Sequence, residues 1–324
     1  MYHIIVNPAS RTGKGKDIWA DLEPVLVDRG VDYKVVFSKK PGHVIELVKD
    51  LSGYTLASSP NSKLKLIVLG GDGTMNEALQ GVSDFDRVEI GYIPTGSSND
   101  FARDLKLPND PVKCLNNILD CKEPVTMDLG IMNFDSTSKQ LSRMHEDKLI
   151  KHRYFDVSCG IGYDAAICEE ALVSPIKKVL NKVGLGKLVY LCIALKQLFT
   201  TKLHNCTMTI DDETTIRLPN FLFAACMIHQ YEGGGFMFSP NANYHDGIID
   251  VCSVSNVSKL TVLKALPKAM KGQHFKYKGV DKYSGKKIHI ETEEPLWVHT
   301  DGEVTMKSSS ITVTCEQEKL QLLM

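Results

Sequence analysis

The sequence lacks the features of membrane-spanning, nucleic-acid-binding and disulfide-rich proteins. No apolar stretch approaches the ~18 residues of a membrane-spanning helix, so we expect no transmembrane segment. The formal net charge is -1, which gives no overall attraction to nucleic acid. The nine cysteines include no C-x-x-C pair and lie mostly inside apolar runs, which is typical of reduced core thiols in a cytoplasmic protein.

The sequence also has no internal repeat and no low-complexity tract, and we expect no signal peptide, because residues 2–6 already predict a strand. We therefore expect a cytoplasmic protein. A hydrophobic fraction of 43% and a charged fraction of 24% are ordinary for a globular chain. A length of 324 residues is long for one core and suits two domains.

One stretch dominates the N-terminal half. Residues 66–69 (Leu-Ile-Val-Leu) predict a buried strand, residues 70–73 (Gly-Gly-Asp-Gly) a tight turn, and residues 74–82 have the apolar spacing of a helix. Glycines there permit positive φ and close approach to a ligand, and the amides that open a helix bind phosphate. Asp72 beside a phosphate indicates an intervening Mg²⁺. The alternative is a turn without a ligand, since many α/β proteins join strand to helix in this way.

Strands alternate with helices from the N-terminus to about residue 124, which predicts a largely parallel sheet with helices on both faces. Ligands of such sheets bind at the carboxyl ends of the strands. Loops 7–15, 38–42, 70–74 and 94–100 each follow a predicted strand, so we expect them at that edge. Their hydroxyl, amide and glycine residues favour a nucleotide site over a set of unrelated turns.

The pattern changes after residue 125. Short predicted strands with polar turns occupy residues 154–159 and much of 207–315, and they predict a sandwich-like second domain. The polar stretch 134–153 is expected to be an exposed hairpin or a partly disordered insertion. The apolar stripe of a helix at 187–199, which includes Cys192, is expected to face the core, with a membrane-facing role as the alternative.

Two acidic turns stand out in the second half. Asp246-Gly247 precedes a predicted strand, and Asp301-Gly302-Glu303 follows one. Taken alone, each fits a hairpin turn, because Asp-Gly is the commonest hairpin dipeptide. A chemical role for these carboxylates therefore needs support from the rest of the chain.

These motifs form an ordered series along nearly the whole chain. The series comprises Asn7-Pro8 with Ser10, the run 70–76, Pro94-Thr95-Gly96 with Asn99-Asp100-Phe101-Ala102, Gly160 with Gly162 and Asp164, the run 233–235, Asp246-Gly247 and Asp301-Gly302-Glu303. With it, the chain resembles the catalytic region of the diacylglycerol kinase superfamily, which includes sphingosine and ceramide kinases and soluble bacterial lipid kinases. Gly-Gly-Asp-Gly-Thr alone is shared with NAD kinases and phosphofructokinases, whereas the full series is specific to lipid kinases.

The resemblance implies a two-domain fold, α/β followed by β, with ATP and the substrate in the cleft between the domains. The first would be a three-layer α/β nucleotide-binding domain, similar to NAD kinases and diacylglycerol kinases, over residues 1–125. The C-terminal tail 309–324 could complete it. The second would be a β-sandwich-like lipid-substrate domain over residues 126–308.

The resemblance also implies the site residues. Glu303 would be the base that takes the proton from the lipid hydroxyl, with Asp301 beside it, and Asp72 would act through Mg²⁺ on the phosphates. A structural Mg²⁺ would be bound by Asp246 with the backbone carbonyls of Asn243 and Ile248. ATP would be bound by residues of the strand-end loops: Asn7, Pro8, Ser10, Arg11, Ser38, Gly71, Asp72, Gly73, Thr74, Asn76, Glu77, Thr95, Gly96 and Asn99.

Three features depart from the family pattern. Ser97 stands where Thr is usual, Arg11 stands where Gly often follows Asn-Pro-x-Ser, and the stretch 134–153 is longer than the usual connection. None of them removes a catalytic group.

These roles fit phosphoryl transfer, which depends on positioning, on charge neutralisation and on one carboxylate that orients the attacking hydroxyl. The sequence thus predicts an ATP- and Mg²⁺-dependent lipid kinase, with diacylglycerol converted to phosphatidic acid. The alternatives are a kinase for a sphingoid base, another lipid or NAD, and a catalytically silent nucleotide-binding scaffold. We expect transient peripheral contact with the inner face of the membrane, and a homodimer stays open.

Overall fold

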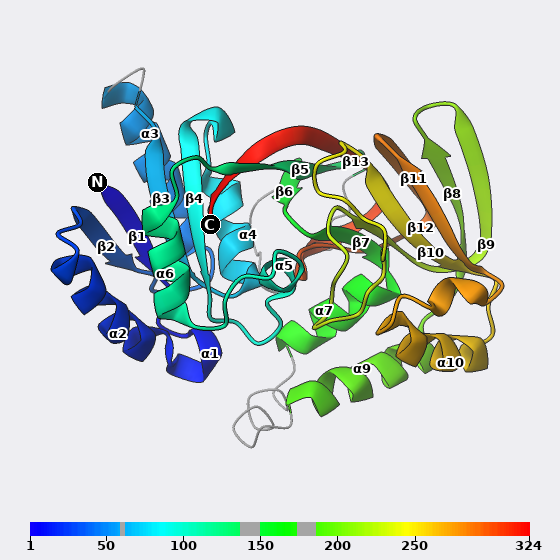
Figure 1. Cartoon of the computed structure of the whole chain (residues 1–324). Coiled ribbons are helices and arrows are strands. Elements are labelled where there is room, and N and C mark those ends of the chain that lie inside the picture. Colours follow the sequence, from blue (N-terminus) through cyan, green and yellow to red (C-terminus); the bar gives the residue numbers. More distant parts are fainter. Residues whose placement is uncertain (59–61, 137–149, 174–185) are drawn as a thin grey trace. The chain divides into compact units, whose positions relative to one another are not determined.

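The computed structural model describes residues 1–58, 62–136, 150–173 and 186–324 (Figure 1). They form two compact units. Unit 1 is Met1–Leu129 with Gln317–Met324, and unit 2 is Gly130–Glu316. Strands β5 (Val125–Phe134) and β13 (Glu303–Leu323) each contribute residues to both units. The domain boundaries expected from the sequence, at residues 125 and 308, stay a prediction beside this division.

Unit 1 is built on a parallel sheet. Its strands pair in the order β4-β3-β1-β2, and residues 321–323 of β13 add a further parallel strand beside β4. The central strands are apolar on both faces: Ile67, Val68 and Leu69 of β3 have no exposed surface, as expected for strands covered by helices on both sides. The strands are β1 (Tyr2–Val6), β2 (Tyr33–Phe37), β3 (Leu64–Gly70) and β4 (Val88–Pro94).

Helices cover both faces of this sheet, which makes unit 1 the three-layer α/β domain predicted from the sequence (Figure 1). On one face, Trp19 and Leu22 of α2 and Ile118 of α6 pack against Ile4 and Ile67. On the other, α3 packs on α4. The helices are α1 (Ser10–Gly13), α2 (Gly15–Asp28), α3 (His43–Ser58), α4 (Asp72–Gly81), α5 (Asp100–Asp104) and α6 (Pro111–Asp120), with a 3₁₀ turn η1 (Phe85–Arg87).

Unit 2 is built on antiparallel strands. The strand order is β11-β10-β9-β7-β12-β13, β8 pairs with both β12 and β9, and β5 pairs with β6. The strands that lie wholly in unit 2 are β6 (His152–Phe155), β7 (Ser158–Gly162), β8 (His204–Ile210), β9 (Thr214–Met227), β10 (Ile249–Ser255), β11 (Val280–Gly285) and β12 (Lys287–Thr300).

Alternation along β9 separates the two cores of unit 2. Ala224 and Cys226 point into an all-strand core, whereas Phe223 and Ala225 point toward the helices, because successive side chains of a strand face opposite sides. The strand core confirms the predicted β-sandwich-like domain. The helices are α7 (Tyr163–Val173), α9 (Gly186–Thr200) and α10 (Lys259–Ala269), with a 3₁₀ turn η2 (His274–Lys276).

Several local expectations are corrected. Helix α3 extends to Ser58, and the single strand expected at 154–159 is broken between β6 and β7. The helix at 187–199 is confirmed as α9, but Cys192 is exposed and the buried face runs through Ile193 and Leu198. Helix α10 was missed. Most of the polar stretch 134–153 lies outside the described residues. None of the described helices is long and apolar enough to cross a membrane.

Candidate active site

Side-chain hydrogen bonds join three loops at the carboxyl edge of the unit 1 sheet, after β1, β3 and β4. Asn7 Nδ2 donates to Thr74 Oγ1 at 2.9 Å, and the hydroxyls of Ser10 and Thr95 lie 2.8 Å apart. The backbone joins the same loops, since Thr95 N donates to Gly70 O at 2.7 Å. Four residues predicted to bind ATP are therefore brought together from three separate loops.

The direction of the hydroxyl bonds follows from their partners. Ser10 Oγ donates its only proton to Asn7 O at 2.9 Å, so Thr95 must donate to Ser10 Oγ. Thr95 is 1% exposed and Ser10 is 9% exposed. This buried chain of bonds fixes the loop around Pro8 before any ligand binds.

The glycines of this edge serve close approach, not a left-handed backbone. A Cβ on Gly96 would lie 2.7 Å from Gly71 Cα, so the two loops touch through bare backbone. The expectation of positive φ in the turn 70–73 is wrong: Gly71 has φ -93°, and Gly73 also stays out of the positive region. Gly71 is the N-cap of α4, which leaves the first amides of that helix at the sheet edge.

Two carboxylates open neighbouring helices at this edge. Asp72 is the first residue of α4, and its Oδ2 accepts a hydrogen bond from the backbone N of Asp100, the first residue of α5, at 3.3 Å. The Asp100 carboxylate pairs with Arg103 at 3.3 Å. Carboxylate oxygens are the ligands that Mg²⁺ prefers in proteins, so the donor set here fits the predicted cation.

Two further predicted residues hold neighbouring loops. Asn99 has a left-handed φ of 49°, and its Oδ1 accepts from Gly96 N at 2.8 Å, which closes the third loop. Glu77 accepts from Gly42 N at 2.8 Å and from Val44 N at 3.2 Å. The Glu77 carboxylate therefore holds the start of α3, and the structure gives it a scaffolding contact in addition to its predicted role.

Other predicted ATP residues of unit 1 make contacts of their own. Ser38 N donates to Val6 O at 2.9 Å, and Asn76 is fully buried and accepts from Gln80 Nε2 at 3.0 Å. Arg11 has φ 50°, in the left-handed region that favours glycine. Arg11 therefore holds a conformation that a glycine would adopt at lower cost.

The predicted structural Mg²⁺ ligands of unit 2 occupy one turn before β10. Asp246 Oδ1 accepts from Ile248 N at 3.0 Å, and Asp246 N donates to Asn243 O at 3.4 Å. Burial raises the pKa of nearby Asp250, Lys282 lowers it, and Asp246 raises it. An exposed carboxylate with two carbonyl oxygens fits a hard cation by donor chemistry, and the site stays a prediction.

The turn that carries Glu303 is a two-residue hairpin. Asp301 and Gly302 connect β12 to β13 with φ of 49° and 80°, and Thr300 pairs with Glu303 across the turn, which is the geometry of a type I′ hairpin. The Asp301 carboxylate accepts three backbone amides of the β6–β7 connection, Asp156 N at 3.1 Å and the N atoms of Val157 and Ser158 at 2.9 Å. Asp301 thereby anchors the turn, and Glu303 follows it half-buried.

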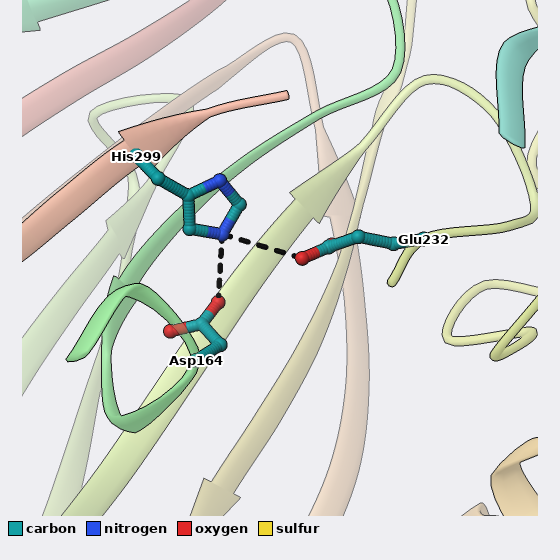
Figure 2. Close-up of side chains that lie close together, drawn as sticks. All are labelled: Asp164, Glu232 and His299. Atoms are coloured by element: carbon teal, nitrogen blue, oxygen red, sulfur yellow. Dashed lines mark hydrogen bonds and ion pairs between the residues drawn. The ribbon is translucent and has the colours of Figure 1, made fainter. Parts of the chain in front are cut away.

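A buried triad of Asp164, Glu232 and His299 lies next to this hairpin (Figure 2). His299 is on β12, two residues before Asp301, Asp164 is in the first turn of α7, and Glu232 follows β9. His299 Nε2 lies 3.2 Å from Asp164 Oδ2 and 3.3 Å from Glu232 Oε1, and its side chain has no exposed surface. The triad was not predicted from the sequence.

The other ring nitrogen of His299 identifies the tautomer. Gly302 N donates to His299 Nδ1 at 3.2 Å, so Nδ1 is an acceptor and the single ring proton is on Nε2. Nε2 therefore donates to the two carboxylates. Although the three side chains are close enough for a metal ion, with ligand atoms within 4.8 Å, a protonated Nε2 has no lone pair for one. The triad is a hydrogen-bonded anchor of the Asp-Gly-Glu hairpin.

The surroundings of the triad are apolar and tightly packed. Burial raises the pKa of Asp164, and the hydrogen bond from His299 opposes that shift. Burial lowers the pKa of His299 and the Glu232 and Asp164 carboxylates raise it, while the Gly302 amide that donates to Nδ1 favours the neutral ring. A Cβ on Gly160 would collide with Asp164 and His299, so only glycine fits there. Burial likewise raises the pKa of the Cys168 thiol, to about 11.

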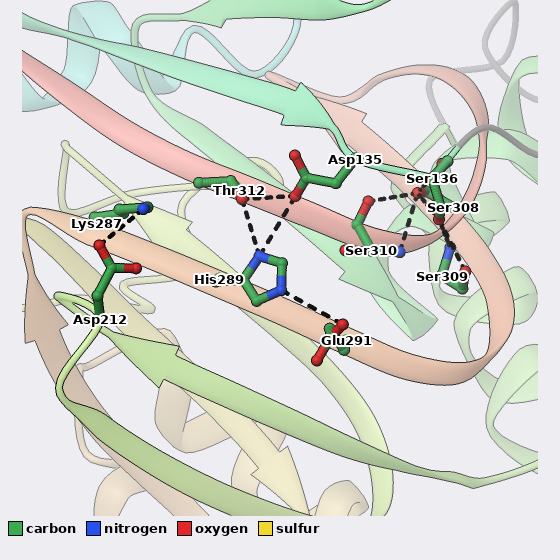
Figure 3. Close-up of polar contacts among 10 residues, drawn as sticks. All are labelled: Asp135, Ser136, Asp212, Lys287, His289, Glu291, Ser308, Ser309, Ser310 and Thr312. Atoms are coloured by element: carbon green, nitrogen blue, oxygen red, sulfur yellow. Dashed lines mark hydrogen bonds and ion pairs between the residues drawn. The ribbon is translucent and has the colours of Figure 1, made fainter.

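A second polar network lies on the β12–β13 surface of unit 2 (Figure 3). His289 Nδ1 lies 2.9 Å from Thr312 Oγ1 and 3.4 Å from Asp135 Oδ2, and Thr312 donates to Asp135 at 2.6 Å. The side chains of Asp135 and Glu291 are 37% and 61% exposed. These are cross-strand contacts of a solvated face, whereas the side chains of the triad are at most 12% exposed.

Some signal for the triad was present in the sequence. Asp164 belongs to the Gly160-Ile161-Gly162 motif, Glu232 directly precedes the glycine run 233–235, and His299 directly precedes the acidic hairpin. Each of these neighbouring motifs belongs to the ordered series found in the sequence. The sequence alone does not show that the three side chains meet, because they come from a helix, a loop and a strand that are far apart along the chain.

Two family models together match most of the chain. One, described as the diacylglycerol kinase catalytic domain, matches residues 1–132, and the other, described as the YegS C-terminal NAD kinase beta sandwich-like domain, matches residues 158–324. The first covers the three-loop edge, and the second covers the triad and the Asp-Gly-Glu hairpin.

Curated relatives and solved structures are similar over most of their length. YtlR of Bacillus subtilis strain 168, described as a candidate lipid kinase, is 30% identical over 306 residues, which are 94% of this chain and 93% of YtlR. A diacylglycerol kinase of Mycobacterium tuberculosis strain H37Rv is 26% identical over 240 residues, 74% of this chain and 70% of that relative. The crystal structure of a candidate diacylglycerol kinase from Bacillus anthracis strain Sterne has a TM-score of 0.72 at 22% identity, over 99% of this chain and 94% of the other, a likeness of fold.

Proposed function

Because the chain belongs to the diacylglycerol kinase family, we propose that it transfers the γ-phosphate of ATP to the hydroxyl of a membrane-borne lipid, with diacylglycerol as acceptor and phosphatidic acid as product. The observation that carries the proposal is the three-loop edge of unit 1. There, buried hydroxyls and amides from three strand ends converge at the N-terminus of α4. Such an edge suits a chain of phosphates, since amides and hydroxyls donate to anionic oxygens.

The phosphates of ATP are proposed to lie against this edge. The Ser10–Thr95 and Asn7–Thr74 bonds hold the loops in place in advance, so little ordering is needed when the nucleotide binds. Gly71 and Gly96 leave no side chain between the two loops, so the backbones of the loops lie in contact.

Asp72, with Asp100 beside it, is proposed to hold Mg²⁺ at the same edge. When bound, Mg²⁺ neutralises charge on the phosphate oxygens. An Asp72→Ala variant is expected to weaken both binding of Mg²⁺·ATP and turnover. An unchanged dependence of the rate on Mg²⁺ concentration would contradict this role.

Glu303 is proposed to be the general base. Its carboxylate takes the proton of the lipid hydroxyl while that oxygen bonds to the γ-phosphorus and the bridging oxygen leaves with ADP. Asp301 cannot easily share this task, because its carboxylate already accepts three backbone amides. We assign Asp301 the position of the turn and Glu303 the proton.

His299 is proposed to be a positioning residue for that base. It holds the Gly302 amide through Nδ1 and is itself held by Asp164 and Glu232 through Nε2. Asp301 fixes the other side of the same turn. The hairpin is therefore held from two directions, which limits the places that Glu303 can occupy.

The test is direct. The purified chain would be incubated with γ-labelled ATP, Mg²⁺ and mixed micelles that each carry diacylglycerol, a sphingoid base or ceramide, with NAD as a soluble acceptor. An organic-extractable labelled product from the diacylglycerol micelles alone is expected. Label on another lipid would change the acceptor, and label on NAD alone would move the chain to the NAD kinases.

Binding separates failure of chemistry from failure of the scaffold. If no acceptor is labelled while ATP binds with a measurable Kd, the silent-scaffold alternative gains support. A chain that binds no ATP in the presence of Mg²⁺ would contradict the role given to the unit 1 edge itself.

A further inference from the structure

Helices α9 and α10 of unit 2 lie in a part of the chain that carries positive charge only. Between Asp250 and Asp281 the sequence contains six lysines and no Asp or Glu, and α10 lies within this stretch. From residue 171 to residue 210, which includes α9, it again contains six lysines and no Asp or Glu. The whole chain has a formal net charge of -1, so this local excess is balanced elsewhere in the protein.

The outer face of α10 combines this charge with apolar surface. Val262, Ala265 and Ala269 are buried and face the unit 2 core. The opposite face exposes side chains at helical spacing, i, i+4 and i+8: Leu260, Lys264 and Lys268. Leu260 is 69% exposed, so this face of α10 presents an apolar side chain beside its two lysines.

The end of α9 continues the same surface (Figure 1). Phe199 is 59% exposed and Leu203 is 41% exposed. Lys259, at the start of α10, connects the helices: its Nζ donates to Phe199 O at 2.9 Å and lies 5.2 Å from the Phe199 ring centroid. Leu203 and Lys259 also line one shallow hollow. Leu260, Lys264 and Lys268 thus share the outer face of α10, and Phe199 and Leu203 lie beside Lys259 where that helix begins.

We propose that this surface, the α9–α10 patch, docks on an anionic lipid bilayer. Exposed Phe and Leu side chains enter the boundary between headgroups and acyl chains, while lysines reach past them to anionic phosphates. Charge complementarity selects this occupant, because the stretch that carries α10 has six lysines and no Asp or Glu, although Lys196 of α9 is paired with Glu170. The inference rests on the proposed function only in that a membrane-borne acceptor has to be reached.

The surface can be tested without catalysis, by co-sedimentation with vesicles. Wild-type chain is expected to bind vesicles of phosphatidylglycerol and phosphatidylcholine and to bind pure phosphatidylcholine much more weakly. Each lysine near an anionic surface contributes about fivefold in binding. The charge reversal Lys264→Glu with Lys268→Glu is therefore expected to reduce partitioning by at least roughly 25-fold, and Leu260→Ser by about tenfold.

Unit 1 offers matched controls. Lys113 and Lys122 are exposed there, and their double reversal to Glu changes the net charge by the same amount. Val27 is 63% exposed on α2, so Val27→Ser is the counterpart of Leu260→Ser. Both controls are expected to bind like the wild type. All six substituted sites, three on α10 and three in unit 1, are exposed, and a thermal melt of each variant confirms that it folds.

Each outcome decides the proposal. Equal binding by the α10 variants and the wild type, equal losses in the controls, or no binding of wild type to any vesicle would overturn it, and the last would point to an acidic protein partner. Turnover on a monomeric short-chain diacylglycerol is expected to be unchanged in the α10 variants. Because sedimentation needs no ATP, absence of kinase activity would count against the proposed function and leave the docking result intact.

Discussion

The two candidate catalytic regions of this molecule are built differently. At the edge of unit 1, polar side chains follow parallel strands and bond to one another beside solvent, as Asn7 does with Thr74. In unit 2, three ionisable side chains meet inside the protein, with Asp164 and His299 separated by 135 residues in sequence. The first region follows a general rule of parallel sheets. The second depends on particular residues meeting in a low-dielectric interior, where an unmatched group costs far more.

The largest expected effect is on chemistry in unit 2. Glu303→Gln keeps the size of the side chain but cannot accept the proton, so kcat is expected to fall by roughly 10² to 10⁴. ATP affinity, measured by calorimetry, should be preserved because the nucleotide is assigned to unit 1. The control is Glu316→Gln, an exposed position on the same strand. If the Glu303→Gln variant kept most of its rate, Glu303 would not be the general base.

Next comes the stability of the triad. His299→Ala leaves the buried carboxylates of Asp164 and Glu232 without their donor, so the free energy of unfolding is expected to fall by about 3 to 5 kcal/mol. Urea denaturation measures it. His289→Ala on the same strand removes a partly exposed histidine between carboxylates and should cost less than about 1 kcal/mol. Similar losses from both would erase the contrast between the buried triad and the surface network.

The same position separates stability from positioning. His299→Gln can still donate to the carboxylates from its amide nitrogen but has no atom at the position of Nδ1 to accept from Gly302 N. We expect it to recover much of the stability lost in His299→Ala while kcat stays low and KM for ATP is unchanged. If kcat recovers in step with stability, His299 is purely structural.

A smaller effect is expected at the unit 1 edge. Thr95→Val removes the hydroxyl that donates to Ser10, while Ser10 keeps its bond to Asn7 O. The unfolding free energy should fall by about 1 kcal/mol, and KM for ATP should rise roughly fivefold. A loss as large as that of His299→Ala would show that this edge is as finely balanced as the buried triad.

The triad also predicts a pH dependence of stability. Burial raises the pKa of Asp164 in the folded protein, so this carboxyl binds more protons in the folded state than in the unfolded state. Stability from this group is therefore present at low pH and is lost progressively as pH rises above about 4. The charges of Glu232 and Glu303 also act on this buried group of side chains, which includes the Cys168 thiol. Unfolding of Asp164→Asn should vary less steeply between pH 5 and 9 than unfolding of the wild type, and an equal slope would contradict the assignment.

The smallest effect is a gain. Arg11 holds φ 50°, a conformation that costs a residue with a Cβ about 1 kcal/mol. Arg11→Gly is therefore expected to raise the melting temperature slightly. The reverse control is Gly30→Ala, since Gly30 has φ 62° and open space around it, and this variant should lose a similar amount. A loss of stability in Arg11→Gly would mean that the arginine side chain makes a contact of greater value.

The sequence analysis predicted the unit 1 edge well for a physical reason. Parallel strands place the residues after them at one edge, so Ser10 and Thr95 could be expected as neighbours although they are 85 positions apart. What failed there was finer backbone detail: the turn glycines were expected at positive φ, but Gly71 lies at -93°. Their lack of a side chain, not their handedness, allows the loops to touch.

In unit 2 the same approach found the hairpin and missed what holds it. The Asp301-Gly302-Glu303 motif was evident, and its hairpin geometry followed from the dipeptide. That the Asp301 carboxylate is occupied by three amides could not be read from the sequence, because those amides belong to residues about 145 positions earlier. Helix α10 was also missed, because its buried residues Val262, Ala265 and Ala269 are small and form only a weak apolar pattern among the lysines.

The sequence by itself determined the family, the two-domain α/β and β architecture and the order of the motifs, because these depend on local patterns and on general rules of strand connection. Only the tertiary structure decided which atoms each buried side chain contacts. His299 became a neutral donor between Asp164 and Glu232 only because an amide meets its other nitrogen. Burial removes water as a partner, so in the interior the nearest atom decides the chemistry of a residue, and distance along the chain carries no information about which atom that is.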